Sequence, residues 1–170
     1  MSRSYLLLSL LAASLLSGCA GYQLGPVKPA AMEGINTIAV PVFANDTYEP
    51  RIEVPATSAV VRQFQLDGTY TITTEENADA VLEATLLSVV RNPARSVRGN
   101  VISTLEFDVE VALNYELIDQ RTGRELARGT VVGGSTFFVN NDVSLDQKQA
   151  LPRAIQELSV RLVSQIAEGW

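Results

Sequence analysis

Cys19 is the single cysteine in a chain of 170 residues. The sequence around it indicates a specific chemical role more clearly than the sequence around any other residue. It follows an apolar stretch, residues 5–16, and the small residues Ser17 and Gly18. A lone free thiol at the start of an exported chain would be a liability. The position therefore predicts that this thiol is covalently modified.

The first 18 residues have the three parts of a secretory signal: a basic start with Arg3, an apolar core and small residues at the cleavage point. The apolar core is too short for a spanning helix, which needs about 20 apolar residues. Leu16-Ser17-Gly18-Cys19 resembles a bacterial lipobox, in which the cysteine is diacylated and becomes the acylated N-terminus. The resemblance implies a lipid anchor on Cys19. Because Ala20 is not Asp, it also implies sorting to the outer membrane, on its periplasmic face; an ordinary signal peptide with an incidental cysteine is the alternative.

Several other kinds of chemistry find no support in the sequence. The chain has no histidine, which removes Ser-His and Cys-His nucleophiles and the usual zinc ligands. It carries a net charge of −6 and no basic stripe, so nucleic acid is not an expected partner. No phosphate-binding glycine loop or other cofactor motif occurs. We therefore expect no cofactor and no enzymatic activity.

Two groups of charged side chains remain as candidates. Glu106, Asp108 and Glu110 alternate along one predicted strand, so their carboxylates share a face. They could hold a hard cation, although the solvated outer face of a sheet is the simpler interpretation.

The second group consists of Arg91, Arg95 and Arg98 in a predicted loop, residues 91–100. Arginine side chains pair bidentately with phosphate, so this loop could hold an anionic lipid headgroup. A solvated loop, or one that docks on another protein, is the alternative.

The elements that position these residues follow from apolar spacing. Strands are expected at 35–42, 70–74, 80–91, 101–118 and 125–139, the fourth with apolar side chains at every odd position from 105 to 117. Helical spacing appears at 54–66 and again from Leu151 to Ile166, with Pro152 near the start of the second helix. Gly133-Gly134 suggests a bulge or bend in the last strand.

The order of elements is β-α-β-β-β-β-α. It predicts an α+β domain, in which two helices pack on one face of a mixed, mostly antiparallel sheet of four to five strands. We expect a signal peptide at 1–18, a lipidated N-terminus and Gly/Pro-rich tether at 19–34, and a single α+β domain at 35–170.

Several segments together resemble the LptE family of lipopolysaccharide-assembly lipoproteins. They are the lipobox with residues 21–24, the run 37–43 with Asn45-Asp46-Thr47, residues 49–54, residues 78–83 and Ala150-Leu151-Pro152. The resemblance implies a lipoprotein that plugs the outer-membrane barrel LptD, helps that barrel assemble and contacts lipopolysaccharide. Family members contact lipid phosphates through basic side chains, and Arg91, Arg95 and Arg98 are the residues here that could do so.

A second hypothesis places the chain in another functional class. Residues 38–45 also resemble the opening strand of lipoproteins related to the curli secretion factor CsgG, or of activators of cell-wall synthases. The partner would then be a secretion pore or a periplasmic enzyme, and no lipid would be bound.

Overall fold

Three long antiparallel strands form the frame of the molecule. In the computed structural model, which describes residues 28–95, 105–139 and 143–169, these strands are β4 (Ala80–Arg95), β5 (Leu105–Asp119) and β6 (Glu125–Val139). They are neighbours in the sheet in that order, and the turn between β5 and β6 contains Gly123 at a φ of 69°. The alternation of apolar residues therefore predicted the central strand correctly.

Short parallel strands extend the sheet beside β4. β1 (Thr37–Ala39) lies between β3 (Thr71–Ile72) and β4, and β2 (Ala44–Asn45) pairs with β4 further along. The sheet thus has six strands, one more than the upper end of the prediction. The strand expected at 35–42 is shorter in the structure: β1 ends at Ala39, before Pro41, which has no amide hydrogen to donate to a ladder.

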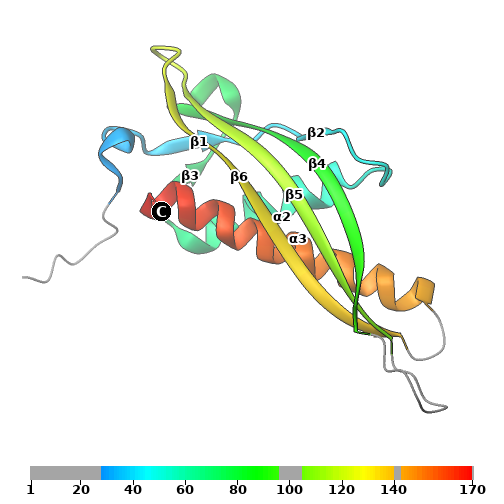
Figure 1. The fold of residues 1–170 in the computed structure, drawn as a ribbon. Helices are drawn as coiled ribbons and strands as arrows, with labels where there is room; N and C mark the ends of the chain where they lie inside the picture. The colour runs from blue at the N-terminus through cyan, green and yellow to red at the C-terminus, as the bar shows by residue number, and fades with distance from the viewer. Residues whose placement is uncertain (1–27, 96–104, 140–142, 170) are drawn as a thin grey trace, which may run out of the picture.

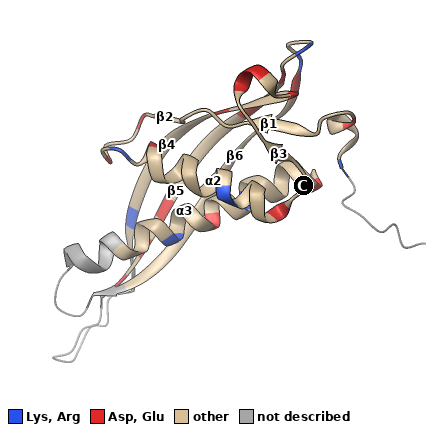
Figure 2. Ribbon diagram, turned by 180° about the vertical axis from the view of Figure 1, so that it is seen from behind, with Lys and Arg blue, Asp and Glu red and all other residues tan. Residues whose placement is uncertain are grey.

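Two helices cover one face of the sheet, as predicted (Figures 1 and 2). α2 (Glu53–Asp67) ends at Gly68, whose φ of 76° is the left-handed conformation that closes many helices. α3 (Val143–Glu168) lies over β6 and β5 and beside α2. Short 3₁₀ turns occur at η1 (Ala30–Met32) and η2 (Glu75–Asn77). No helix in the described part of the chain is long and apolar enough to cross a membrane.

The predicted start of α3 was wrong, and the bulge that Gly133-Gly134 suggested in β6 is not formed. α3 begins at Val143 and contains Pro152 in its interior, whereas we expected the helix to start near that proline. A helix can continue through proline at the cost of a lost backbone hydrogen bond. The register between β5 and β6 runs through Gly133 and Gly134 without a bulge. Gly133 instead permits the close approach of α3, which a Cβ atom at this position would block.

The core lies between the helices and the inner face of the sheet. The side chains at odd positions of β5 from Val109 to Leu117 are buried, together with Phe64 of α2 and Leu158 and Leu162 of α3. Full burial of one such side chain contributes about 1.5–3 kcal/mol. The opposite face of the sheet is covered by no described helix (Figure 1).

Two aspartates accept hydrogen bonds from backbone amides at the ends of strands. One Asp79 carboxylate oxygen accepts hydrogen bonds from the amides of Asn36 and Thr37 and from the Thr37 hydroxyl, each at 2.9 Å. These bonds hold the pKa of Asp79 below its usual value. In the β5–β6 turn, Asp119 accepts from the amides of Thr122 and Arg121, which likewise lowers its pKa.

Candidate functional site

Arg91 lies on β4, opposite Val109 of β5, and not in a loop. The strand predicted at 80–91 continues to Arg95, so the prediction of a loop was wrong for residues 92–95. Arg91 forms an ion pair with Glu49, and each of the two side chains is 29% exposed. Sequence reasoning missed this pair, because the two residues lie 42 positions apart in the chain.

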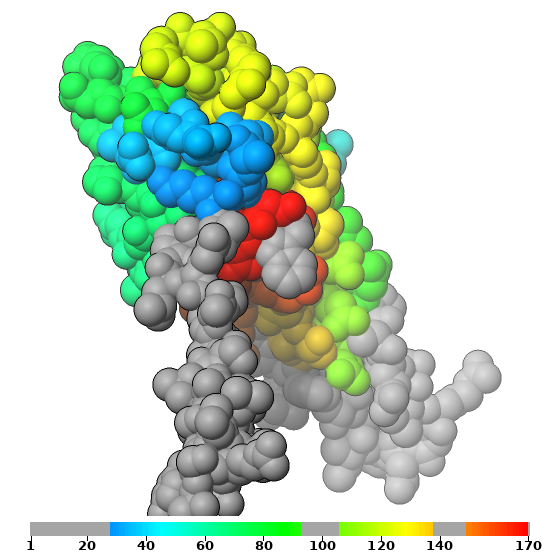
Figure 3. Space-filling view, turned by 90° about the vertical axis from the view of Figure 1, so that its left-hand side faces the viewer, coloured from blue at the N-terminus to red at the C-terminus, as the bar shows by residue number. Residues whose placement is uncertain are grey.

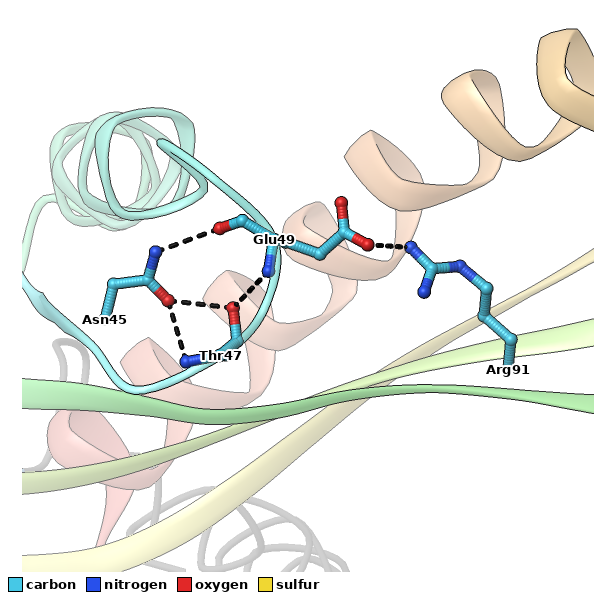
Figure 4. A network of polar contacts seen from close by, with 4 residues as sticks. All are labelled: Asn45, Thr47, Glu49 and Arg91. Carbon is cyan, nitrogen blue, oxygen red and sulfur yellow. Dashed lines mark hydrogen bonds and ion pairs between the residues drawn. The ribbon is translucent and has the colours of Figure 1, made fainter.

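A network of hydrogen bonds shapes the loop that carries Glu49 (Figure 4). The Asn45 side-chain amide donates to the Glu49 carbonyl at 2.9 Å, and its carbonyl oxygen accepts from the Thr47 amide at 3.0 Å and the Thr47 hydroxyl at 2.8 Å. The Thr47 hydroxyl in turn accepts from the Glu49 amide at 3.1 Å. Asn and Thr side chains that bond to the backbone two residues onward fix a turn locally. The loop, residues 45–51, therefore has a defined shape that aims Glu49 at Arg91.

The loop has two further structural features, a hydrogen bond to α2 and a residue in a left-handed conformation. The Asn45 amide also donates to Glu53 in the first turn of α2, at 2.9 Å. Arg51 adopts a φ of 64°, a left-handed conformation that is uncommon for residues other than glycine. The loop is thus joined to the start of α2 on one side and to β4 on the other.

The other predicted basic residues lie at the limit of the described chain or beyond it. Arg95 is the last residue of β4, and Arg98 lies outside the described residues. The structure shows that Arg91 points to the helix-covered side of the sheet, since its strand partner Val109 is buried there. The grouping of the three arginines around one ligand stays a prediction.

The predicted acidic row lies on the uncovered face of the sheet. Glu106, Asp108 and Glu110 alternate with buried residues of β5, and the Thr136 hydroxyl of β6 donates to Asp108 at 2.7 Å. Within the described residues no group of three or more carboxylates is placed to hold a metal ion. Glu116 adds a further carboxylate and pairs with Arg128 of β6. The uncovered face is therefore polar and predominantly acidic.

The described chain begins at one end of the domain. Lys28 donates to the Ile35 carbonyl at 2.7 Å and to the Asn36 side chain at 3.0 Å, and its ammonium lies 4.9 Å from the centre of the Tyr70 ring. Burial raises the pKa of Tyr70 to about 12. Figure 3 shows this N-terminal segment packed beside the end of α3. We call this the proximal end; the distal end is where β4 ends and β5 begins. Cys19 and the signal peptide lie outside the described residues.

The chain is similar to one protein family and to several solved structures. The profile of the family LptE, Lipopolysaccharide-assembly, matches residues 35–168. No curated protein matches by sequence.

Three solved structures share the fold at low identity. A protein from Caulobacter crescentus CB15 is 17% identical with a TM-score of 0.51, and the match covers 81% of this chain and 92% of that one. Protein XCC0632 from Xanthomonas campestris is 15% identical with a TM-score of 0.54, over 84% and 90%. A minor lipoprotein from Acinetobacter baumannii is 10% identical with a TM-score of 0.52, over 79% and 94%. At these identities the likeness supports the fold alone.

Proposed function

Since the chain belongs to the LptE family of lipopolysaccharide-assembly proteins, we propose that it is an outer-membrane lipoprotein that occupies the barrel LptD, helps that barrel assemble and contacts lipopolysaccharide on its way to the outer leaflet. The observation that carries this proposal is the family match, which spans nearly the whole described domain. The proposal assigns the chain no catalytic step.

The shape of the domain supports a role inside a barrel. The 15-residue strand β5 is roughly 50 Å long, so the domain is elongated between its proximal and distal ends. Its uncovered sheet face is polar, and the lumen of an outer-membrane barrel is polar as well. A rigid, elongated body with a polar face is what a lumen of this kind can accommodate.

The described chain begins at the proximal end, which supports attachment of the domain to a membrane at that end. The lipid on Cys19 would join the domain at Lys28, where the described chain begins, and this N-terminal segment lies beside the end of α3 (Figure 3). Two or three acyl chains hold a protein on a membrane almost permanently, because each buried methylene contributes about 0.8 kcal/mol. The distal end would then be the part of the domain furthest from the anchor.

We assign the lipid contact to the distal end, where β4 carries Arg91 and Arg95 toward Arg98. Arg91 already pairs with Glu49, so its contact with a lipid phosphate would be shared with that carboxylate. We therefore expect Arg95 and Arg98 to contribute more to lipid affinity than Arg91.

Depletion of the protein from its native host tests the function directly. The proposal predicts that the folded form of the barrel, read from its heat-dependent mobility in gels, decreases in parallel with the protein. Lipopolysaccharide in the outer leaflet should decrease after it. A normal level of folded barrel together with normal surface lipopolysaccharide would refute the proposal.

A further inference from the structure

Among the described strands, none pairs with one side of β4 over its distal half. β1 pairs with β4 at Ala80 and Val81, and β2 pairs with it at Thr85 and Leu86. Beyond Leu86, the described strands pair with β4 only on the side of β5. Residues 87–95 therefore form an edge of the sheet.

The opposite edge of the same sheet is protected. Glu157 of α3 accepts a hydrogen bond from the Gly134 amide at 2.7 Å, and Arg161 of α3 donates to the Val132 carbonyl at 3.1 Å. Glu157 and Arg161 also pair with each other. Proteins commonly shield strand edges in this way, since an open edge invites pairing with another chain. The β6 edge is therefore shielded at Val132 and Gly134.

The sequence of β4 sets the length of this edge. Pro93 has no amide hydrogen, and proline within a sheet is found at edge strands or bulges. An added strand would therefore pair along residues 87–92, which extend about 20 Å. That length fits a single short strand.

Apolar side chains are exposed along this edge. Leu87, next to a register shift in β4, is 44% exposed, and Val90 is 41% exposed. Tyr48 is fully exposed at the tip of the loop 45–51. We call these three side chains, with the backbone of residues 87–92, the Tyr48 edge.

The loop is attached to β4 on both sides of Tyr48. The Asp46 amide donates to the Leu86 carbonyl at 3.0 Å, and Glu49 pairs with Arg91. In the loop, Tyr48 lies between Asp46 and Glu49 in sequence. On β4, Leu87 and Val90 lie between Leu86 and Arg91, the residues that those two contact. The hydrogen bonds of Asn45 and Thr47 fix the loop beforehand (Figure 4). A rigid aromatic residue loses little conformational entropy on binding, which makes it an effective anchor.

We propose that an extended segment of a partner protein adds to the sheet along the Tyr48 edge as a further strand, with Tyr48 packed over it. A polypeptide is the occupant because backbone amides and carbonyls pair with those of a second strand, whereas an acyl chain offers neither. The proposal rests on the proposed function only for the identity of the partner, the barrel. The edge itself follows from the strand pairing and the exposed side chains.

Photocrosslinking in the native host tests the Tyr48 edge. Benzoylphenylalanine replaces Tyr48, Leu87 or Val90 in the full-length lipoprotein, with Leu66 on α2, 74% exposed, as the control position. We expect adducts with the barrel from positions 48, 87 and 90. Adducts from 87 and 90 should map within about six residues of each other on the barrel, because a strand advances about 3.3 Å per residue. Position 66 should not label that segment.

Hydrogen exchange on the purified complex gives a second measurement. Those backbone amides of residues 87–92 that face away from β5 should exchange at least about tenfold more slowly in the complex than in the isolated protein. The double variant Y48A/V90D should reduce this protection, whereas L66D, an equally drastic change elsewhere, should not.

The outcomes separate this inference from the proposed function. If the barrel copurifies but positions 48, 87 and 90 give no adduct, the Tyr48 edge is refuted and the barrel role stands. If these positions label one segment of a protein other than the barrel, the edge is supported and the barrel role is refuted. Adducts only between two copies of this chain would refute the proposed occupant.

Discussion

Gly133 of β6 and Ala154 of α3 meet backbone to backbone: a Cβ atom added to Gly133 would stand 2.2 Å from the Ala154 carbonyl oxygen. The same atom would lie 2.4 Å from the Leu158 amide nitrogen. Real Cβ atoms do not approach backbone this closely, so only glycine lets α3 lie against the sheet here. The contact explains a glycine in the middle of a strand, where its lack of a side chain would otherwise be a cost.

Gly133→Ala should therefore destabilise the domain. We expect a loss of about 1–3 kcal/mol or more in the free energy of unfolding, because α3 must shift to make room. Chemical denaturation followed by circular dichroism measures this loss. Gly134→Ala is the matched control, since its new Cβ would meet nothing closer than 3.7 Å. Equal stability of the two variants would contradict the close contact.

Asp79→Ala should loosen the junction between β1 and β4. It removes three hydrogen bonds to Asn36 and Thr37, and we expect a loss of about 1–3 kcal/mol at neutral pH. Glu83→Ala, which removes an exposed carboxylate from β4, should have little effect.

The effect of Asp79 should depend on pH in a defined direction. The folded-state pKa of Asp79 lies below its unfolded value, so its contribution is complete above about pH 4 and is lost as the pH falls through the folded pKa. The difference in unfolding free energy between wild type and Asp79→Ala should therefore shrink below about pH 4. A difference that grows on acidification would contradict this assignment.

Substitution of Arg91 should affect stability, whereas substitution of Arg95 and Arg98 should affect lipid binding. Arg91→Ala leaves Glu49 without its ion pair and should lower the midpoint of thermal unfolding slightly, since a partly exposed pair contributes up to about 1 kcal/mol. Replacing Arg95 and Arg98 together should weaken binding to lipopolysaccharide without changing that midpoint. Replacing Arg124 and Arg128 together by Ala, near the β5–β6 turn, removes the same charge and serves as the control for binding. Equal binding by the double variant and the control would remove the lipid-site assignment.

Cys19→Ala should leave the protein without acyl chains and release it from the membrane fraction. Mass spectrometry of the N-terminal peptide and membrane fractionation measure the two effects. Fold and thermal stability should not change, because the described domain begins at Lys28. An unchanged membrane fraction with intact acyl mass on the variant would refute the lipobox interpretation.

The parts of the fold that sequence could predict are those with a regular apolar period. The odd positions of β5 alternate with polar residues over most of a strand, and the buried stripe of α3 repeats with helical spacing, so both were found. The start of α3 was misplaced because Val143 and its neighbours carry no such stripe and Pro152 suggested a beginning. Strand β2 was missed because it follows Pro41, at which the first strand was expected to end, and Ala44 and Asn45 are not residues typical of strands.

The candidate site depended on contacts between distant residues, which periodicity cannot reveal. Asn45-Asp46-Thr47 was noted for its resemblance to the family, and nothing in a single sequence joins Glu49 to Arg91. The open edge of β4 likewise follows from what β1 and β2 leave uncovered, a property of the assembled sheet. The exposure of Tyr48 could not be predicted from its residue type either, since tyrosine is found both in cores and at surfaces.

The most direct test of the central claim is purification of the full-length lipoprotein from detergent-solubilised outer membranes of its native host, with copurifying proteins identified and quantified by mass spectrometry. Membership of the lipopolysaccharide-assembly family predicts one barrel protein in a one-to-one complex that survives mild heating. Recovery of a cell-wall synthase, of a ring of identical chains or of the lipoprotein alone would contradict the claim.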